Sequence, residues 1–234
     1  MNFKRGFFTL LFISVFKLSL FGSYLYKDEL VFNPSFNEEI EKIGSELYKK
    51  TGISLRLVML KALPKNMNIV DYEKDLIKDF SEPTIILTFS EIDSKVDILV
   101  NDPSLYNYFD KQQVLSPVAS PVQAFVIALF YSDSISSFKE ILTDYGGTII
   151  PLLAQKSKEN ELIGKYSSAM FNGYADIAEQ VAGTKGVTLD SAVGNANKNT
   201  LLLIKVLFYG FIVYAIFLYI KRKIYIKRQK LEQK

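Results

Sequence analysis

The segment PTIILTFSEIDSKVDILVND, residues 83–102, contains two short runs of β-branched and aliphatic residues separated by a polar turn. TIILTFS (84–90) and KVDILV (95–100) have the length and composition of strands, and residues 91–94 join them. This spacing predicts an antiparallel β-hairpin. Upstream, ISLRLVML (53–60) is almost continuously apolar, which predicts a strand that is largely buried.

An amphipathic helix is predicted ahead of residues 53–60. Ser35 or Asn37 is the expected N-cap, and Gly52 is the expected end of the helix. Its apolar residues recur at intervals of three and four, and those expected to be buried are Ile40, Ile43 and Leu47.

A second helix is predicted from Asn68 to about Phe80, and Pro83 follows it. Its inward side chains are expected to be Val70, Leu76, Ile77 and Phe80. The resulting order, α-β-α-β-β with buried strands between helices, predicts the α/β class. We expect a three-layer α/β/α sandwich with a small mixed sheet.

The rest of this segment is less regular. Residues 105–114 predict a short helix, and 118–147 predict irregular or short-helical structure. A stripe of apolar residues predicts a long helix over about 157–183. The polar, small-residue stretch 184–199 is typical of a linker that leads to a membrane.

Residues 200–220, TLLLIKVLFYGFIVYAIFLYI, contain one charge, Lys205. As a helix they would measure about 30 Å, the thickness of the hydrocarbon core of a bilayer. The tail that follows, 221–234, is strongly basic, and basic residues beside a span stay in the cytoplasm. We therefore predict a transmembrane helix with a cytoplasmic C-terminal tail.

The N-terminus carries a second membrane signal. Lys4 and Arg5 precede the uncharged residues 6–16, as in a signal peptide or a retained signal anchor, and both alternatives stay open for residues 1–26. In either case residues 27–183 are exported. The predicted location is the inner membrane of a bacterium, with a periplasmic domain.

The charge distribution follows the same division. The whole chain holds 28 Lys and Arg and 25 Asp and Glu; the flanks 1–24 and 200–234 hold 11 and 1 of these, which leaves 17 and 24, a net charge of −7, for 25–199. An acidic domain argues against nucleic acid as a partner. The chain has no Cys and no His, which excludes disulfides, thiolate nucleophiles and His-based catalysis.

Three aspartates are the candidate metal ligands: Asp93, Asp102 and Asp110. They lie near the ends of the predicted hairpin and the helix after it, where ligands bind in open α/β sheets, and Ca²⁺ prefers such oxygen ligands. The alternative is ordinary turn and N-cap chemistry, which the sequence Asp102-Pro103-Ser104 favours. No other cofactor is expected.

Asp71, Asp75 and Asp79 lie four residues apart and share one face of the second predicted helix. Lys74 and Lys78 follow at ion-pairing distance, so we interpret this face as solvated rather than as a cation site.

The middle of the sequence is rich in aromatic residues: Tyr106, Tyr108, Phe109, Phe125, Phe130 and Tyr131. Exposed aromatics are typical of partner surfaces, whereas buried ones belong to the core. The pattern alone does not separate the two.

Three stretches, KIGSELYKKTGISLRLVML, PTIILTFSEIDSKVDILVND and YFDKQQVL, resemble the TPM-domain family of exported or membrane-held domains. The resemblance covers residues 36–115 and extends to 146–181, with 118–145 as an insertion. It implies an α/β/α sandwich exposed beside a membrane. Members commonly carry an Asp and a Gly before the first helix, where this chain has FNPSF (32–36).

These observations predict a membrane-anchored TPM-like domain that binds other envelope proteins as a scaffold or modulator, without catalysis. The alternative is a Ca²⁺- or Mg²⁺-dependent acid-phosphatase-like hydrolase on the same domain, an activity that the resemblance implies for some plant members. No small-molecule substrate is identifiable.

Overall fold

The computed structural model describes residues 23–191 and 194–232, with the side chains of 23–191 and 206–225. The chain divides into two compact units at residues 192–193. Most of the segment expected to be a signal peptide or anchor lies outside the described residues.

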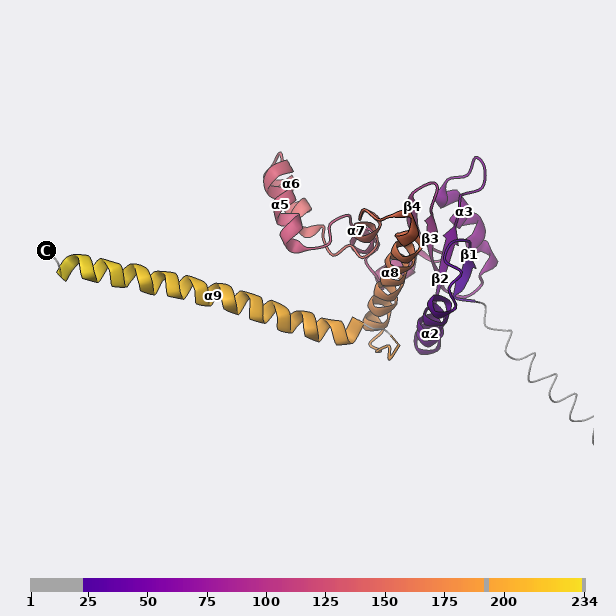
Figure 1. The fold of residues 1–234 in the computed structure, drawn as a ribbon. Helices are drawn as coiled ribbons and strands as arrows, with labels where there is room; N and C mark the ends of the chain where they lie inside the picture. The colour runs from indigo at the N-terminus through magenta and orange to yellow at the C-terminus, as the bar shows by residue number, and fades with distance from the viewer. Residues whose placement is uncertain (1–22, 192–193, 233–234) are drawn as a thin grey trace, which may run out of the picture. The chain divides into compact units, whose positions relative to one another are not determined.

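The first unit contains four described strands (Figure 1): β1 (Leu25–Asp28), β2 (Ser54–Leu60), β3 (Thr84–Ser90) and β4 (Lys95–Val100). Its described α-helices are α2 (Pro34–Thr51), α3 (Ile69–Leu76), α4 (Lys111–Val114), α5 (Pro121–Tyr131), α6 (Ile135–Thr143), α7 (Ile150–Leu153) and α8 (Leu162–Thr184). Short 3₁₀ turns are η2 (Ile77–Asp79), η3 (Pro103–Asn107) and η4 (Glu159–Glu161).

The strands form one mixed sheet in the order β1-β2-β3-β4. The first three are parallel, and β4 pairs with β3 in the antiparallel sense, with Thr88 opposite Asp97. The α/β class, the small mixed sheet and the hairpin are therefore confirmed. Strand β1 was not predicted; it overlaps the end of the segment 1–26, so the folded unit begins before residue 27.

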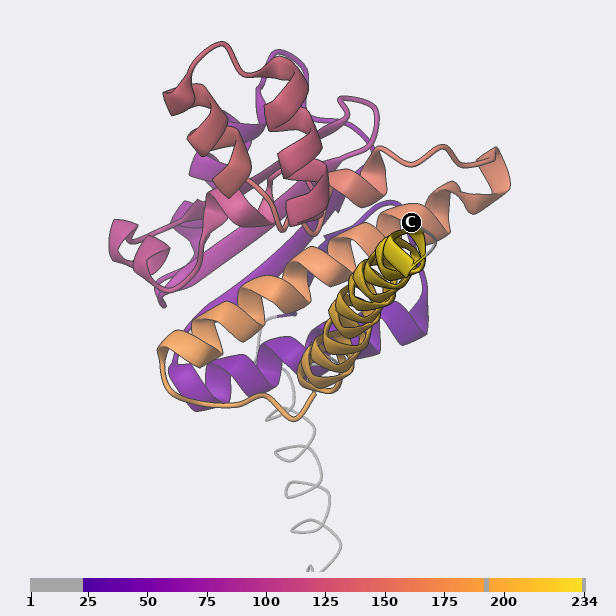
Figure 2. The same cartoon turned by 90° about the vertical axis from the view of Figure 1, so that its left-hand side faces the viewer.

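Helices cover both faces of the sheet. Alternate residues of β2 point to opposite sides, so Leu57 packs in one apolar cluster with α2 and α8, whereas Val58 packs in another with Ile77 beside α3. Figure 2 shows α2 and α8 side by side. Gly44 permits this packing, because a Cβ there would lie 2.4 Å from the hydroxyl oxygen of Tyr174.

Helix α2 begins earlier than expected. The N-cap is Asn33, whose side chain accepts a hydrogen bond from the Ser35 N–H at 3.0 Å, so the prediction of Ser35 or Asn37 is wrong. Gly52 ends the helix as predicted, with φ +73° and an N–H donated to Tyr48 O at 2.8 Å. The predicted core residues are buried: Ile40, Ile43 and Leu47.

Helix α3 begins after Asn68 as predicted, and the Asn68 side chain accepts from the Asp71 N–H at 2.9 Å. The inward face differs from the expected one. The buried side chains of α3 and the adjoining turn are Ile69, Glu73 and Ile77. Val70, Leu76 and Phe80 are only partly buried.

Residues 118–147 form a helical hairpin, α5 and α6, which Figure 1 shows set apart from the sheet. The long helix α8 runs from Leu162 to Thr184, a start about five residues later than predicted. Part of the expected linker is ordered: Leu189 is buried in the core of the first unit.

The second unit is one helix, α9 (Gly194–Glu232), which contains the whole of residues 200–220. Between Val206 and Ile220 its described side chains carry no charge and are exposed. Within the described part of the chain, no helix is both long and apolar enough to cross a membrane.

Candidate interaction surfaces

Asp93 lies in the turn between β3 and β4, where it shapes the loop. Its carboxylate accepts hydrogen bonds from the Ser90 hydroxyl at 2.6 Å and from the Leu63 N–H at 2.8 Å. These bonds hold the pKa of Asp93 below its usual value, because they favour the charged form.

Asp102 and Asp110 are helix caps. Asp102 accepts from the Ser104 N–H and Asp110 from the Gln113 N–H, both at 2.9 Å. Asp93 precedes β4 and Asp102 follows it, so about 20 Å of strand separates them. The structure does not bring the three predicted ligands together. Among the described residues, no three or more His, Cys, Asp or Glu could jointly hold a metal ion.

The row of aspartates on α3 and η2 is solvated, as predicted. Asp71, Asp75 and Asp79 are exposed, and the Asp75 carboxylate pairs with the Lys78 ammonium at 2.7 Å. An exposed pair of this kind contributes little to stability, so this face needs no functional explanation.

The structure separates the aromatic residues into two groups. Phe109 is buried, and Tyr106 and Tyr108 pack partly buried against the same core. Phe130 and Tyr131, in contrast, are 75% and 74% exposed on α5. The first group is core, and the second belongs to a surface.

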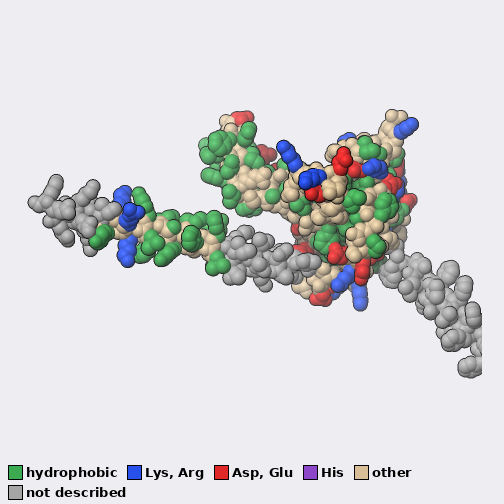
Figure 3. Space-filling model, in the orientation of Figure 1, with side chains coloured by type: hydrophobic (Ala, Val, Ile, Leu, Met, Phe, Trp, Pro, Cys, Tyr) green, Lys and Arg blue, Asp and Glu red, His purple; other side chains and the backbone are tan. Residues whose placement is uncertain are grey.

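We call this second group, with its apolar neighbours, the hairpin surface: Val122, Phe125, Val126, Leu129, Phe130, Tyr131 and Ile135. Figure 3 shows hydrophobic side chains covering the visible face of the hairpin. Monomeric proteins rarely expose contiguous large apolar groups, so this patch indicates an interaction site.

Local capping explains why the hairpin is helical. The Ser120 side chain accepts from the Gln123 N–H at 3.2 Å at the start of α5, and the Ser134 hydroxyl oxygen accepts from the Ser137 N–H at 3.1 Å at the start of α6. Ala128 lies on the buried side of α5. The caps fix where α5 and α6 begin, and the larger apolar side chains of α5 face outward.

A second surface lies at the carboxyl ends of the parallel strands. We call it the strand-end surface: Glu29, Phe32, Lys61, Glu91 and Ile92. Phe32 is 75% and Ile92 is 66% exposed. The loops are joined to one another, because Lys61 N–H donates to the Glu29 carboxylate at 2.9 Å and Ile92 N–H donates to Lys61 O at 3.0 Å.

Asp28 builds the part of this surface that presents Phe32. Its carboxylate accepts hydrogen bonds from the N–H groups of Leu30, Val31 and Phe32 at 2.8–2.9 Å. Phe32 has φ +47°, an unfavourable value for a bulky residue. The three bonds hold this conformation and leave the phenyl ring in solvent.

A buried polar cluster lies under α3. Glu73 is fully buried, and burial, together with the nearby Asp97 carboxylate, raises its pKa to about 8. Neither carboxyl oxygen of Glu73 has a hydrogen-bond partner within the described residues. The Thr88 hydroxyl is near enough to offset part of the rise in the pKa of Glu73, although it forms no hydrogen bond there. The Lys111 ammonium pairs with Asp97 at 2.6 Å.

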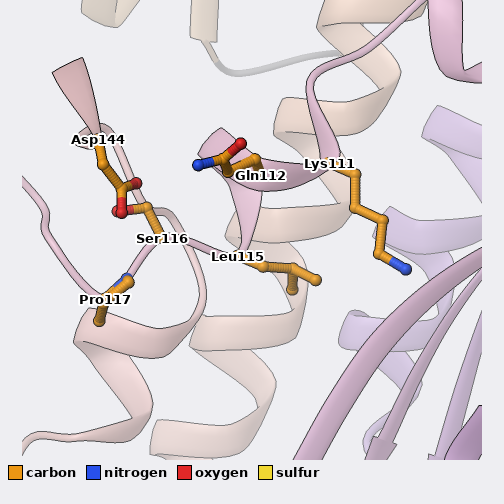
Figure 4. Close-up of a pocket in the computed structure, with 6 residues that line it drawn as sticks. All are labelled: Lys111, Gln112, Leu115, Ser116, Pro117 and Asp144. Carbon is orange, nitrogen blue, oxygen red and sulfur yellow. The ribbon is translucent and has the colours of Figure 1, made fainter. Parts of the chain in front are cut away.

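A hollow of about 420 Å³ lies between α4 and the end of α6 (Figure 4). Asp144 and Ser116 point toward each other there, whereas the Lys111 side chain extends away from them, consistent with its ion pair to Asp97. The charged groups do not converge on one point, so the hollow has no arrangement suited to acid–base chemistry.

The segment after α8 is bound to α2. The Glu46 carboxylate accepts from the N–H groups of Asp190 and Ser191 at 2.7 and 2.8 Å, and from the Ser191 hydroxyl. Partial burial works against ionisation, but these bonds and the one from Lys50 lower the pKa of Glu46 to about 2. The chain is therefore anchored to the first unit as far as Ser191.

In comparisons with known proteins, the sequence matches no family model and no curated protein.

Proposed function

We propose that the protein is a membrane-anchored module of the bacterial envelope that acts by binding other envelope proteins, as a scaffold or modulator. The proposed anchor is the apolar run of residues 200–220, whose one charge is Lys205. The structure describes the side chains of this run only from Val206 onward. The supporting observation is that one helix, α9, continues without a break through this run and into the basic tail.

The basic residues set the orientation that we propose. The tail 221–234 and the N-terminal Lys4 and Arg5 stay in the cytoplasm, and the α/β unit lies outside it. The N-terminal segment, predicted over residues 1–26 and overlapped at its end by β1, acts as a signal peptide or anchor in this arrangement.

A fusion experiment tests the orientation. A reporter enzyme that is active only outside the cytoplasm should be active when fused after Asn195 and inactive when fused after Lys234. The physical reason is that the basic tail resists transfer across the membrane. The reverse pattern of activities would contradict the proposed topology.

The strand-end surface is where we place the binding of partner proteins. Ligands of open α/β sheets bind beside the carboxyl ends of the strands, and here two large apolar side chains, Phe32 and Ile92, stand exposed beside the Lys61–Glu91 ion pair. Apolar anchors with a charged rim are typical of protein interfaces. The resemblance of residues 36–115 to TPM domains, which are exposed beside membranes, supports the same function.

Site-specific photo-cross-linking tests the binding function. A photoreactive residue in place of Ile92, in the full chain in intact cells, should give a discrete adduct with another envelope protein, because this side chain is exposed where the partner would bind. The matched control is Asp75, which is exposed on the outer face of α3. No adduct at position 92, or the same adducts at both positions, would contradict the proposal.

The alternative, a metal-dependent phosphatase, has no observation in its favour. Its carboxylates would have to converge, whereas β4 separates Asp93 from Asp102, and each of them already accepts backbone hydrogen bonds. We therefore do not adopt it.

A further inference from the structure

We propose that the hairpin surface docks on the lipid bilayer itself, with its apolar side chains in the interfacial layer of the membrane. The inference rests on the proposed anchoring of residues 200–220. It assigns the hairpin to lipid and leaves the strand-end surface free for protein partners.

The first step in the argument is the chemistry of α5. Val122, Phe125, Val126 and Leu129 recur at i, i+3, i+4 and i+7 and make one exposed apolar stripe. No charged residue occurs from Leu115 to Ser132. With 11 residues, α5 would measure about 16 Å, too short to cross a bilayer but suited to lying in its surface.

The second step is the kind of residue at the end of α5. Phe130 and Tyr131 are exposed next to the turn between the two helices; Tyr is enriched at membrane interfaces, and Phe is typical of the apolar face of helices that lie there. The charges of the hairpin lie past the tip: Asp133 is in the turn, and Lys139 and Glu140 are on α6. The hairpin therefore pairs an apolar helix, α5, with a more polar one, α6, so its charged residues lie apart in the sequence from the apolar stripe.

The third step is the length of the tether. Glu46 holds the chain to the first unit as far as Ser191, and the proposed span begins at Thr200. Residues 192–193 and the first six residues of α9, 194–199, lie between, and together they reach at most about 16 Å. A domain held within that distance of lipid meets the bilayer at a high effective concentration, so an exposed apolar hairpin finds lipid before any diffusing partner.

The shape of the hairpin also favours lipid over a protein. The two helices project from the unit, and the apolar side chains cover a protruding element (Figures 1 and 3). A protein partner would need a matching groove, whereas fluid acyl chains adapt to a convex surface.

Tryptophan fluorescence can test this cleanly because the chain contains no Trp. Single-Trp variants of the full chain are reconstituted in vesicles of phosphatidylcholine and phosphatidylglycerol, with or without brominated acyl chains, which quench Trp on contact. Phe130→Trp reports on the hairpin, Ile92→Trp on an exposed apolar site of similar kind elsewhere, and Tyr214→Trp on the anchor. Leu129→Trp is a second hairpin probe, in case one substitution disturbs folding.

We expect the emission of Phe130→Trp and Leu129→Trp to shift to shorter wavelength and to be lost in brominated vesicles, as for Tyr214→Trp, while Ile92→Trp is unaffected. Quenching of Tyr214→Trp without quenching of either hairpin variant would overturn lipid docking and leave the anchoring intact. If brominated vesicles do not quench Tyr214→Trp, the proposed membrane anchor is wrong, and the inference that rests on it is wrong as well. Equal quenching at positions 92 and 130 would also overturn the assignment, because the contact would not be specific to the hairpin.

Discussion

Replacing Glu73 with glutamine should make the α/β unit more stable at pH 8, by as much as about 5 kcal/mol, and leave its stability nearly unchanged at pH 4.5. The pKa of Glu73 is about 8 in the fold, against 4.5 for an ordinary glutamate. Between these values the folded state keeps a proton that the unfolded chain releases. Each pH unit therefore costs the wild type about 1.4 kcal/mol.

The sign follows from the direction of the shift. The wild type loses stability as pH rises from about 4.5 to about 8 and loses no more from this group above that. Asp97 adds to the loss by disfavouring a second negative charge, whereas Lys111 reduces it. Glutamine is neutral throughout and of similar volume, so it avoids the cost of burying a charge.

Urea unfolding of residues 23–191 at several pH values measures this effect. The segment holds every core residue that the structure describes in the first unit. The control is Glu38→Gln on the exposed face of α2, which should follow the wild type at every pH. If the curves for Glu73→Gln and wild type run parallel from pH 4.5 to 8, the buried carboxyl does not hold its proton as described.

Replacing Leu47 with alanine should lower the free energy of unfolding by about 2–5 kcal/mol, the usual cost of emptying a buried leucine site. Leu47 has no exposed surface and packs in the cluster between α2 and the sheet. Urea unfolding of the same segment measures the change.

Leu129→Ala is the matched control, because the same side chain is deleted at a position that is 60% exposed. It should change the free energy of unfolding by less than about 0.5 kcal/mol. A similar loss in both variants would mean that the hairpin surface is part of the core, and a small loss at Leu47 would mean that the α2 face is not buried.

The strands and the first two helices could be predicted because their signals are local. Residues 84–90 and 95–100 are rich in β-branched and aliphatic residues, which favour strands. The short turn between them sets how the two strands pair. Strand β1 could not be predicted. It has four residues, follows an apolar N-terminal run, and is a strand only because β2, about 30 residues later, supplies its partner.

The candidate site was harder to predict than the fold. Asp93 and Asp102 are close in sequence, but the strand between them carries them to opposite ends of the sheet. Glu73 was missed, although its spacing with Ile69 and Ile77 was a readable signal, because glutamate on a helix is usually exposed.

The sequence by itself determined the order of elements from α2 to β4, the buried stripe of α2, the solvated aspartates that begin on α3, and the run with a single charge before a basic tail. Only the tertiary structure decided which apolar residues are core, since Phe109 is buried and Phe130 is not, although both lie in similar aromatic surroundings in the sequence. The physical reason is that periodicity describes one segment, whereas burial depends on the element that packs against it. Helix α3 packs on β3 and β4 and buries a carboxyl group, whereas no described element covers the apolar stripe of α5, which is left as a surface.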